Sequence, residues 1–67
     1  MDIGRSLRMC LAKEGKSQEW LAEKIETSRP TISNYCANKG NMKASTLQRI
    51  CDVFGLNVSE FIALGEK

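Results

Sequence analysis

The chain has 67 residues, of which 42% are hydrophobic and 27% are charged, and its formal net charge is +2. A chain of this length buries only about 60% of its unfolded surface and supports one core, so we expect a single domain over residues 1–67. The balance of hydrophobic and charged residues excludes a disordered chain. There is neither an apolar run of about 20 residues nor a signal peptide, so we expect a cytoplasmic protein without a membrane partner.

Two amphipathic helices are predicted at the start of the chain. The first spans residues 2 to about 14, with the charge of Asp2 at the positive end of the helix and Gly15 as its stop. Its apolar positions are Ile3, Leu7, Cys10 and Leu11. The second spans residues 18–25 and follows Ser17, a good N-cap residue. Its apolar stripe consists of Trp20, Leu21, Ala22 and Ile25.

A third helix is predicted after the connector residues 26–28, and it runs to about Ala37. Because the residue before a proline avoids the α region, the favoured register has Arg29 as N-cap and Pro30 as the first helical residue. Ser28 as N-cap is the alternative register. The residues expected to face inward are Ile32, Tyr35 and Cys36, and those expected to face outward are Arg29, Pro30, Ser33 and Asn34. Asn38 suits the left-handed conformation that ends a helix.

Two further helices are predicted after a polar loop at residues 39–43. One covers about residues 44–54 and is ended by Gly55. Its shared apolar face consists of Leu47, Ile50, Cys51 and Phe54. Asn57 and Glu60 have the spacing of a capping box, which opens a short fifth helix through about residue 64. No strand is predicted, so we expect an all-α fold of five helices.

The second and third predicted helices have the arrangement of a helix-turn-helix. Three residues join them, and the outer face of the third is polar, which lets one helix enter a major groove while the other crosses the DNA backbone. Arginine can bind guanine and asparagine can bind adenine through paired hydrogen bonds. The candidate base-reading residues are Arg29, Pro30, Ser33 and Asn34. A solvated polar face without a partner is the alternative interpretation.

The charge distribution favours a polyanionic partner at the same place. The segment 27–51 contains no Asp or Glu. The basic residues of that segment are Arg29, Lys39, Lys43 and Arg49. A polyanion would therefore meet one positive face of the protein. Tyr35 lies on the apolar side of its helix, but its hydroxyl group can stay near the surface within reach of a phosphate.

Five segments of the chain together resemble the Cro and phage-repressor (XRE) helix-turn-helix family. Two of them are SQEWLAEKI at residues 17–25 and SRPTISNY at residues 28–35. The remaining three, at residues 46–50, 54–56 and 58–61, are similar to the fourth and fifth helices of the family. The resemblance covers nearly the whole chain. It implies a lambda-repressor-like, five-helix domain that binds double-stranded DNA.

The resemblance also implies roles for individual residues. Gln18 would hold a phosphate and support the reading helix. Arg29 and Asn34 would read bases, with Pro30 and Ser33 close to the bases or the adjoining backbone. The loop residues that would contact phosphates are Lys39, Asn41 and Lys43.

Three positions depart from the family pattern. Glu26 stands where the family usually has a glycine in the turn, so the turn must be made in another way or with strain. Cys36 replaces a frequent glutamate and has no evident role beyond packing. Asn38 replaces a frequent glycine, which is a conservative exchange at a left-handed position.

The cysteine and histidine content argues against catalysis and against a cofactor. Cys10, Cys36 and Cys51 are odd in number and not closely spaced, which disfavours disulfides or a zinc motif and predicts buried thiols. The chain has no histidine and no glycine-rich phosphate loop after a strand. We therefore expect neither an enzyme nor a small-molecule substrate.

The apolar residues near the end of the chain predict a homodimer. Phe61, Ile62 and Leu64 exceed what one short helix must bury within a monomer, so we expect them to form a dimer interface. A dimeric repressor of the phage or plasmid type would read two half-sites about one helical turn apart. An antitoxin or adaptor module that binds another protein is the alternative. A third possibility is the DNA-reading head of a longer repressor, although the end of the chain just after the fifth helix favours a complete small protein.

Overall fold

The computed structural model of the protein describes residues 2–66, which form five helices and no strand. The helices are α1 (Ile3–Glu14), α2 (Gln18–Lys24), α3 (Arg29–Cys36), α4 (Ala44–Phe54) and α5 (Val58–Gly65). The predicted all-α fold of five helices is therefore confirmed. None of the helices in this part of the chain has the length and apolar character needed to cross a membrane.

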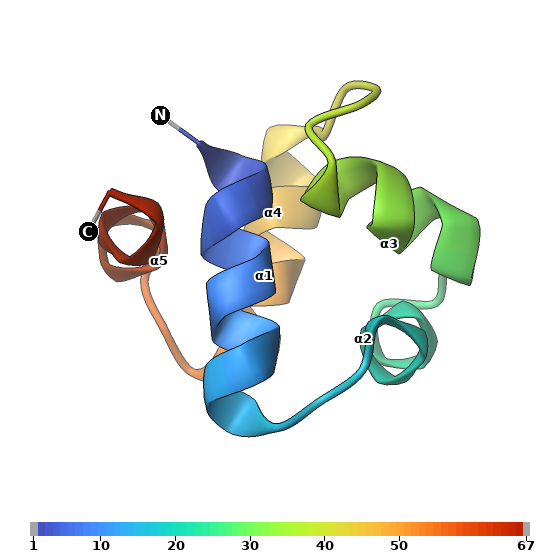
Figure 1. Ribbon diagram of the computed structural model, residues 1–67, viewed down its shortest axis with the longest axis horizontal. Coiled ribbons are helices and arrows are strands. Elements are labelled where there is room, and N and C mark those ends of the chain that lie inside the picture. Colours follow the sequence, from blue (N-terminus) through green and yellow to red (C-terminus); the bar gives the residue numbers. More distant parts are fainter. Residues whose placement is uncertain (1, 67) are drawn as a thin grey trace.

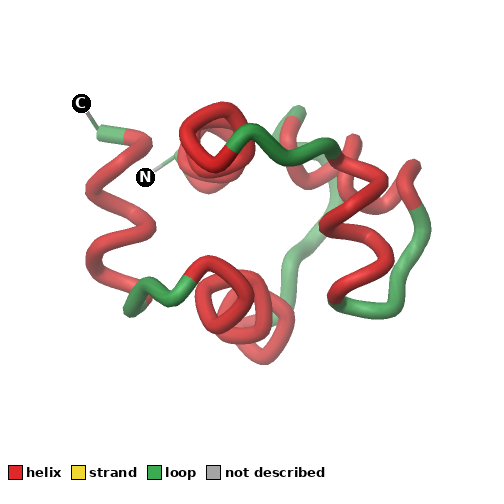
Figure 2. Tube along the Cα trace, turned by 90° about the horizontal axis from the view of Figure 1, so that it is seen from below, coloured by secondary structure: helices red, strands yellow, loops and turns green. Residues whose placement is uncertain are grey.

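The helices are arranged around α1. In Figure 1, α1 occupies the middle with α4 behind it, α5 lies on one side, and α2 and α3 lie on the other. The tube in Figure 2 shows the same order, with α1 and α4 seen nearly end-on between α5 and the α2–α3 pair. This arrangement separates α3 from α5 by the width of the domain, so the two predicted functional surfaces lie at opposite sides.

Local hydrogen bonds fix where most of these helices begin and end. The side chains of Asp2, Ser17, Ser28 and Asn57 accept hydrogen bonds from amides in the first turns of α1, α2, α3 and α5, respectively. The predicted capping box is confirmed, because the Asn57 amide donates to Glu60 Oε1 at 3.0 Å and the Glu60 amide donates to Asn57 Oδ1 at 2.7 Å. Gly15 and Gly55 end α1 and α4 in the left-handed conformation, at φ 66° and 68°.

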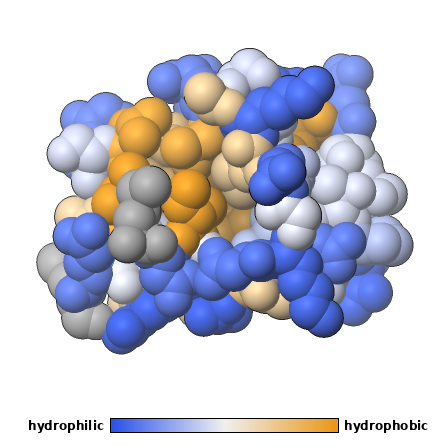
Figure 3. Space-filling model, turned by 90° about the horizontal axis from the view of Figure 1, so that it is seen from above, coloured by the Kyte–Doolittle hydropathy of each residue, from blue (hydrophilic) through white to orange (hydrophobic). Residues whose placement is uncertain are grey.

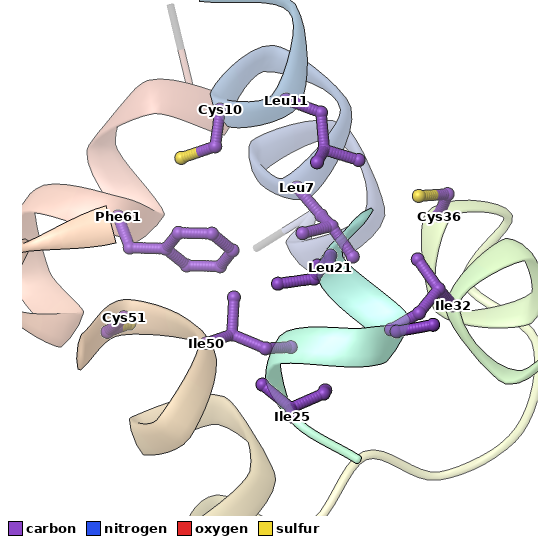
Figure 4. Packing of buried hydrophobic residues seen from close by; sticks show 11 residues of the cluster. Leu7, Cys10, Leu11, Leu21, Ile25, Ile32, Cys36, Ile50, Cys51 and Phe61 are labelled. Carbon is purple, nitrogen blue, oxygen red and sulfur yellow. The ribbon is translucent and has the colours of Figure 1, made fainter. Parts of the chain in front are cut away.

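One apolar core holds the five helices together (Figure 4). Its residues with no exposed surface are Leu7, Leu21, Ile32, Ile50, Cys51 and Phe61. Each helix therefore contributes at least one completely buried side chain. Burying an aliphatic or aromatic side chain of this size stabilises the fold by about 1.5 to 3 kcal/mol, before the entropy of ordering it is subtracted.

Phe61 belongs to this core, so the prediction that it lies in a dimer interface is wrong. Its ring points toward Leu7 and Ile50 in Figure 4 and has no exposed surface. The reason is the close approach of α5 to α1. The buried Ser6 hydroxyl donates to the Ile62 carbonyl at 3.3 Å, and a Cβ atom at Gly65 would overlap Ser6 Oγ.

The prediction that the three thiols are small buried apolar groups is confirmed. Cys10, Cys36 and Cys51 are free and buried, each at most 4% exposed. Burial raises the pKa of all three, and it raises the pKa of Cys10 to about 11. Their protonated thiols are consequently weak nucleophiles at neutral pH.

We predict that Cys10 of the folded protein is alkylated at pH 8 about a hundredfold more slowly than in guanidinium chloride. The ordinary thiol pKa is 9.0, and the pKa of Cys10 in the folded protein is about 11. At a pH below both values, each unit by which the pKa rises lowers the population of the reactive thiolate tenfold. Mass spectrometry after timed iodoacetamide labelling measures both rates. A Ser59→Cys variant, which places a thiol at an exposed position of α5, serves as the control for reagent quality. Equal rates for Cys10 in both states would contradict its burial.

Candidate nucleic-acid interface

The turn between α2 and α3 is made by a strained residue that is not glycine. Glu26 has φ 55°, in the left-handed region. On its two sides the Glu26 amide donates to the Glu23 carbonyl at 3.3 Å and the Thr27 amide donates to the Ala22 carbonyl at 2.8 Å. The sequence left two alternatives for the turn at Glu26, a turn made in another way or a strained one. The structure has the strained turn.

Ser28, and not Arg29, is the N-cap of α3, so the register favoured by the sequence is wrong and its alternative is confirmed. Ser28 has extended backbone angles, φ −95° and ψ 153°. Its Oγ accepts a hydrogen bond from the Thr31 amide at 3.3 Å and lies 2.8 Å from Thr31 Oγ1. These hydrogen bonds outweigh the preference of a residue before proline for the extended region. Arg29 and Pro30 therefore lie within the first turn of the helix.

The two faces of α3 are clearly separated. Ile32 and Cys36 point into the core with 0% and 4% exposure, while Tyr35 is half-buried between the faces. The residues on the outward face are all exposed, as predicted: Arg29, Pro30, Ser33 and Asn34. Asn38 follows the helix at φ 59°, which confirms the predicted left-handed residue at its end.

The predicted phosphate-binding residues lie on α2, on α3 and in the loop after α3. Lys39, Asn41 and Lys43 are exposed in the loop between α3 and α4, and Gln18 is half-buried at the first position of α2. Tyr35, Lys39 and Asn41 line one open hollow of about 180 Å³, together with residues of the same loop and Ile3. The structure thus places Tyr35, Lys39 and Asn41 around one hollow beside the end of α3.

The surface has two different halves. In Figure 3 the half that carries α3 is polar, whereas apolar side chains gather on the half that carries α4 and α5. The polar half includes α3 and the loop after it, residues 29–43, which contain no acidic residue. The basic side chains of this segment attract a polyanion, and no carboxylate within the segment itself opposes the approach of phosphates.

The exposed polar helix, its short turn and its partner α2 agree with the sequence comparison. Residues 7–61 match the helix-turn-helix family. The chain belongs to this family. In this helix-turn-helix protein α2 and α3 are the paired helices, and the five-helix, lambda-repressor-like fold implied by the resemblance is confirmed.

A curated relative is similar along nearly the whole chain. The competence pilus inhibition repressor of Acinetobacter baylyi is 32% identical over 66 residues. The alignment covers 98% of this chain and 60% of that repressor, so the helix-turn-helix protein described here spans about three fifths of the length of its relative.

We predict that Glu26→Gly stabilises this helix-turn-helix protein by about 0.5 to 1 kcal/mol. Glycine relieves the left-handed strain of about 1 to 2 kcal/mol, and part of this gain is offset by its larger backbone entropy in the unfolded state. Urea unfolding followed by circular dichroism measures the change. The control is Glu23→Gly, which also removes one exposed carboxylate but lies inside α2, and it should destabilise by about 1 kcal/mol. A loss of stability in both variants would contradict strain at Glu26.

Proposed function

We propose that the chain is a sequence-specific DNA-binding transcriptional regulator, a repressor of the phage or plasmid type that acts as a homodimer in the cytoplasm. The observation that supports it most directly is the exposed polar edge of α3, whose other edge is anchored in the core by Ile32 and Cys36. Family membership and the repressor name of the relative agree with this proposal.

The dimensions of α3 fit a major groove. A helix with its side chains is about 10 to 12 Å across, and the groove is about 12 Å wide and admits one helix. Arg29 and Pro30 occupy the first turn, at the exposed end that would enter the groove first, and Ser33 and Asn34 follow one turn later. Arg29 would pair with guanine and Asn34 with adenine, because their side chains can each form two parallel hydrogen bonds with those base edges.

Phosphate contacts would fix the helix in the groove. We propose this role for Gln18 at the start of α2, and for the group beside the end of α3, Tyr35, Lys39, Asn41 and Lys43. Such contacts are independent of base sequence, so they would set register and affinity without setting preference. The two kinds of contact therefore predict two different responses to substitution.

We predict that Asn34→Ala relaxes the preference at one base position, at a cost of about 1 to 3 kcal/mol on the preferred sequence. Lys39→Ala, in contrast, should weaken binding to all duplexes alike and reduce the steepness of the salt dependence by about one unit in a log–log plot. Fluorescence anisotropy with duplexes selected from a random pool, and with single-base variants of them, measures both. Equal loss on every sequence for Asn34→Ala would mean that this side chain reads no base.

Salt dependence separates this function from the alternative of an antitoxin or adaptor. If about six basic side chains of a dimer neutralise phosphates, the log–log slope is near −5, whereas a module whose partner is a protein should show little salt-dependent DNA binding.

The homodimer is proposed through α5. Once Phe61 is assigned to the core, Ile62 and Leu64 are the remaining predicted interface residues, and both are only partly buried. Both belong to α5, which lies opposite α3 across α1 in Figure 1, and apolar side chains gather on the half of the molecule that carries α5 in Figure 3. A symmetric pair joined there would present two α3 helices, one for each half-site of an operator.

We predict that Ile62→Gln shifts the protein toward the monomer and weakens operator binding at least about tenfold, since linked half-sites bind more tightly than separate ones. The preferred base sequence of each half-site should stay the same. Sedimentation equilibrium and anisotropy measure the two effects, with the exposed Ala63→Gln variant as the control on the same helix. A wild-type protein that remains monomeric at high concentration and on DNA would contradict the proposed dimer.

A further inference from the structure

We propose that Asn38 is a positioning residue for base reading: its side chain clamps the end of the recognition helix α3 to the first turn of α1. The clamp consists of two hydrogen bonds. The Gly4 amide donates to Asn38 Oδ1 at 2.9 Å, and Asn38 Nδ2 donates to Asp2 Oδ1 at 2.7 Å. This inference rests on the proposed DNA-binding function. In it, Asn38 contributes to base reading by orienting α3 and does not itself contact a base.

The clamp closes an unusually tight junction between two helices. A Cβ atom at Gly4 would lie 2.6 Å from the Cys36 carbonyl oxygen and 2.9 Å from that of Tyr35. The first turn of α1 therefore lies directly on the last carbonyl groups of α3, and only glycine allows this approach. Figure 1 shows the same junction, with the end of α3 against α1 and its beginning beside α2.

One carboxylate serves both helices at this junction. Asp2 Oδ1 accepts the Arg5 amide at 2.9 Å as the N-cap of α1 and also accepts the Asn38 amide group. These two hydrogen bonds lower the pKa of Asp2, with the bond from Asn38 as the larger cause. The carboxylate therefore remains ionised, and remains an acceptor for Asn38, at neutral pH.

A second contact from α1 holds the same end of α3. The last turn of α3 contains no basic residue that could balance the partial negative charge of its carbonyl groups. Arg8 of α1 supplies that charge, since its Nη1 donates to the Cys36 carbonyl. The end of α3 is thus attached to α1 at two neighbouring positions. At Cys36 the attachment is through the backbone carbonyl, and at Asn38 it is through the side chain.

The position of this junction connects it to base reading. Asn34 and Ser33 lie about one turn before Asn38, and the loop that carries Lys39 begins directly after it, with the Lys39 amide bonded to the Asn34 carbonyl at 2.7 Å. A rotation of α3 about its anchored face would move these side chains relative to the groove. Hydrogen bonds to base edges weaken steeply with distance and angle, so the preference for one base sequence depends strongly on the orientation of α3. The attraction to phosphates, which is the same for all sequences, depends on it less.

The test compares base preference in variants that break and rebuild the clamp. Asn38→Gly retains a residue that tolerates φ 59° but removes both clamp bonds. We expect its preference for a selected operator over a scrambled duplex to fall about tenfold, a typical effect of losing one base contact, while its affinity for the scrambled duplex stays within about twofold. The matched control is Asn57→Ala, which removes a capping side chain from α5 without touching α3 and should keep the full preference.

A charge-exchanged pair provides the rescue. Asn38→Asp alone opposes two carboxylates at the clamp and should lose preference. The double variant Asp2→Asn with Asn38→Asp restores a donor opposite an acceptor. The side-chain oxygen at position 2 can still cap α1, and the NH₂ group at position 2 can donate to the carboxylate at position 38. Recovery of at least half of the lost preference, on a logarithmic scale, supports the clamp.

The outcomes separate the clamp from the proposed function. A wild-type protein that prefers no duplex overturns the DNA-binding function. A selective wild-type protein whose Asn38→Gly variant is equally selective overturns the clamp alone. The clamp is also overturned if Asn57→Ala loses as much preference as Asn38→Gly, or if the double variant recovers none, because the effect would then follow stability instead of orientation.

Discussion

The burial of one edge of α3 is the constraint on which the rest of this structure depends. An isolated helix of eight residues is not stable in water, so α3 exists because Ile32 and Cys36 are packed in the core. The same packing determines which edge stays outside. Since that outer edge carries Arg29, Ser33 and Asn34, the core that stabilises the helix also presents its polar side chains to solvent.

The two ends of α3 are set by backbone conformations that side chains usually avoid. Glu26 makes the turn before the helix and Asn38 ends it, both at positive φ. Asparagine adopts this conformation at little cost, whereas glutamate does so with strain. The strain at Glu26 is compatible with a functional role for the turn, because a residue held in this region must be constrained by the structure on both sides.

Much of the fold could be predicted from the sequence, because it is determined by local patterns. The capping box at Asn57 and the stop at Gly15 follow from contacts within a few residues, and the outward face of α3 follows from the helical spacing of its apolar residues. Two predictions failed where competing effects had to be weighed. The sequence could not show that the side-chain hydrogen bonds of Ser28 outweigh the effect of Pro30. It also could not show that α5 approaches α1 closely enough, at Gly65, to bury Phe61. The clamp had no local signal either, because its partners are more than 30 residues apart in the chain.

We propose that the exposed edge of α3 is the surface that meets duplex DNA. Titration of the ¹⁵N-labelled protein with a duplex selected from a random pool, followed by amide chemical shifts, tests this claim most directly. We expect the largest shift changes in residues 28–43 and at the start of α2, with small changes in the first turn of α5. Changes that are largest in α4 and α5, or no changes in dilute salt, would contradict it.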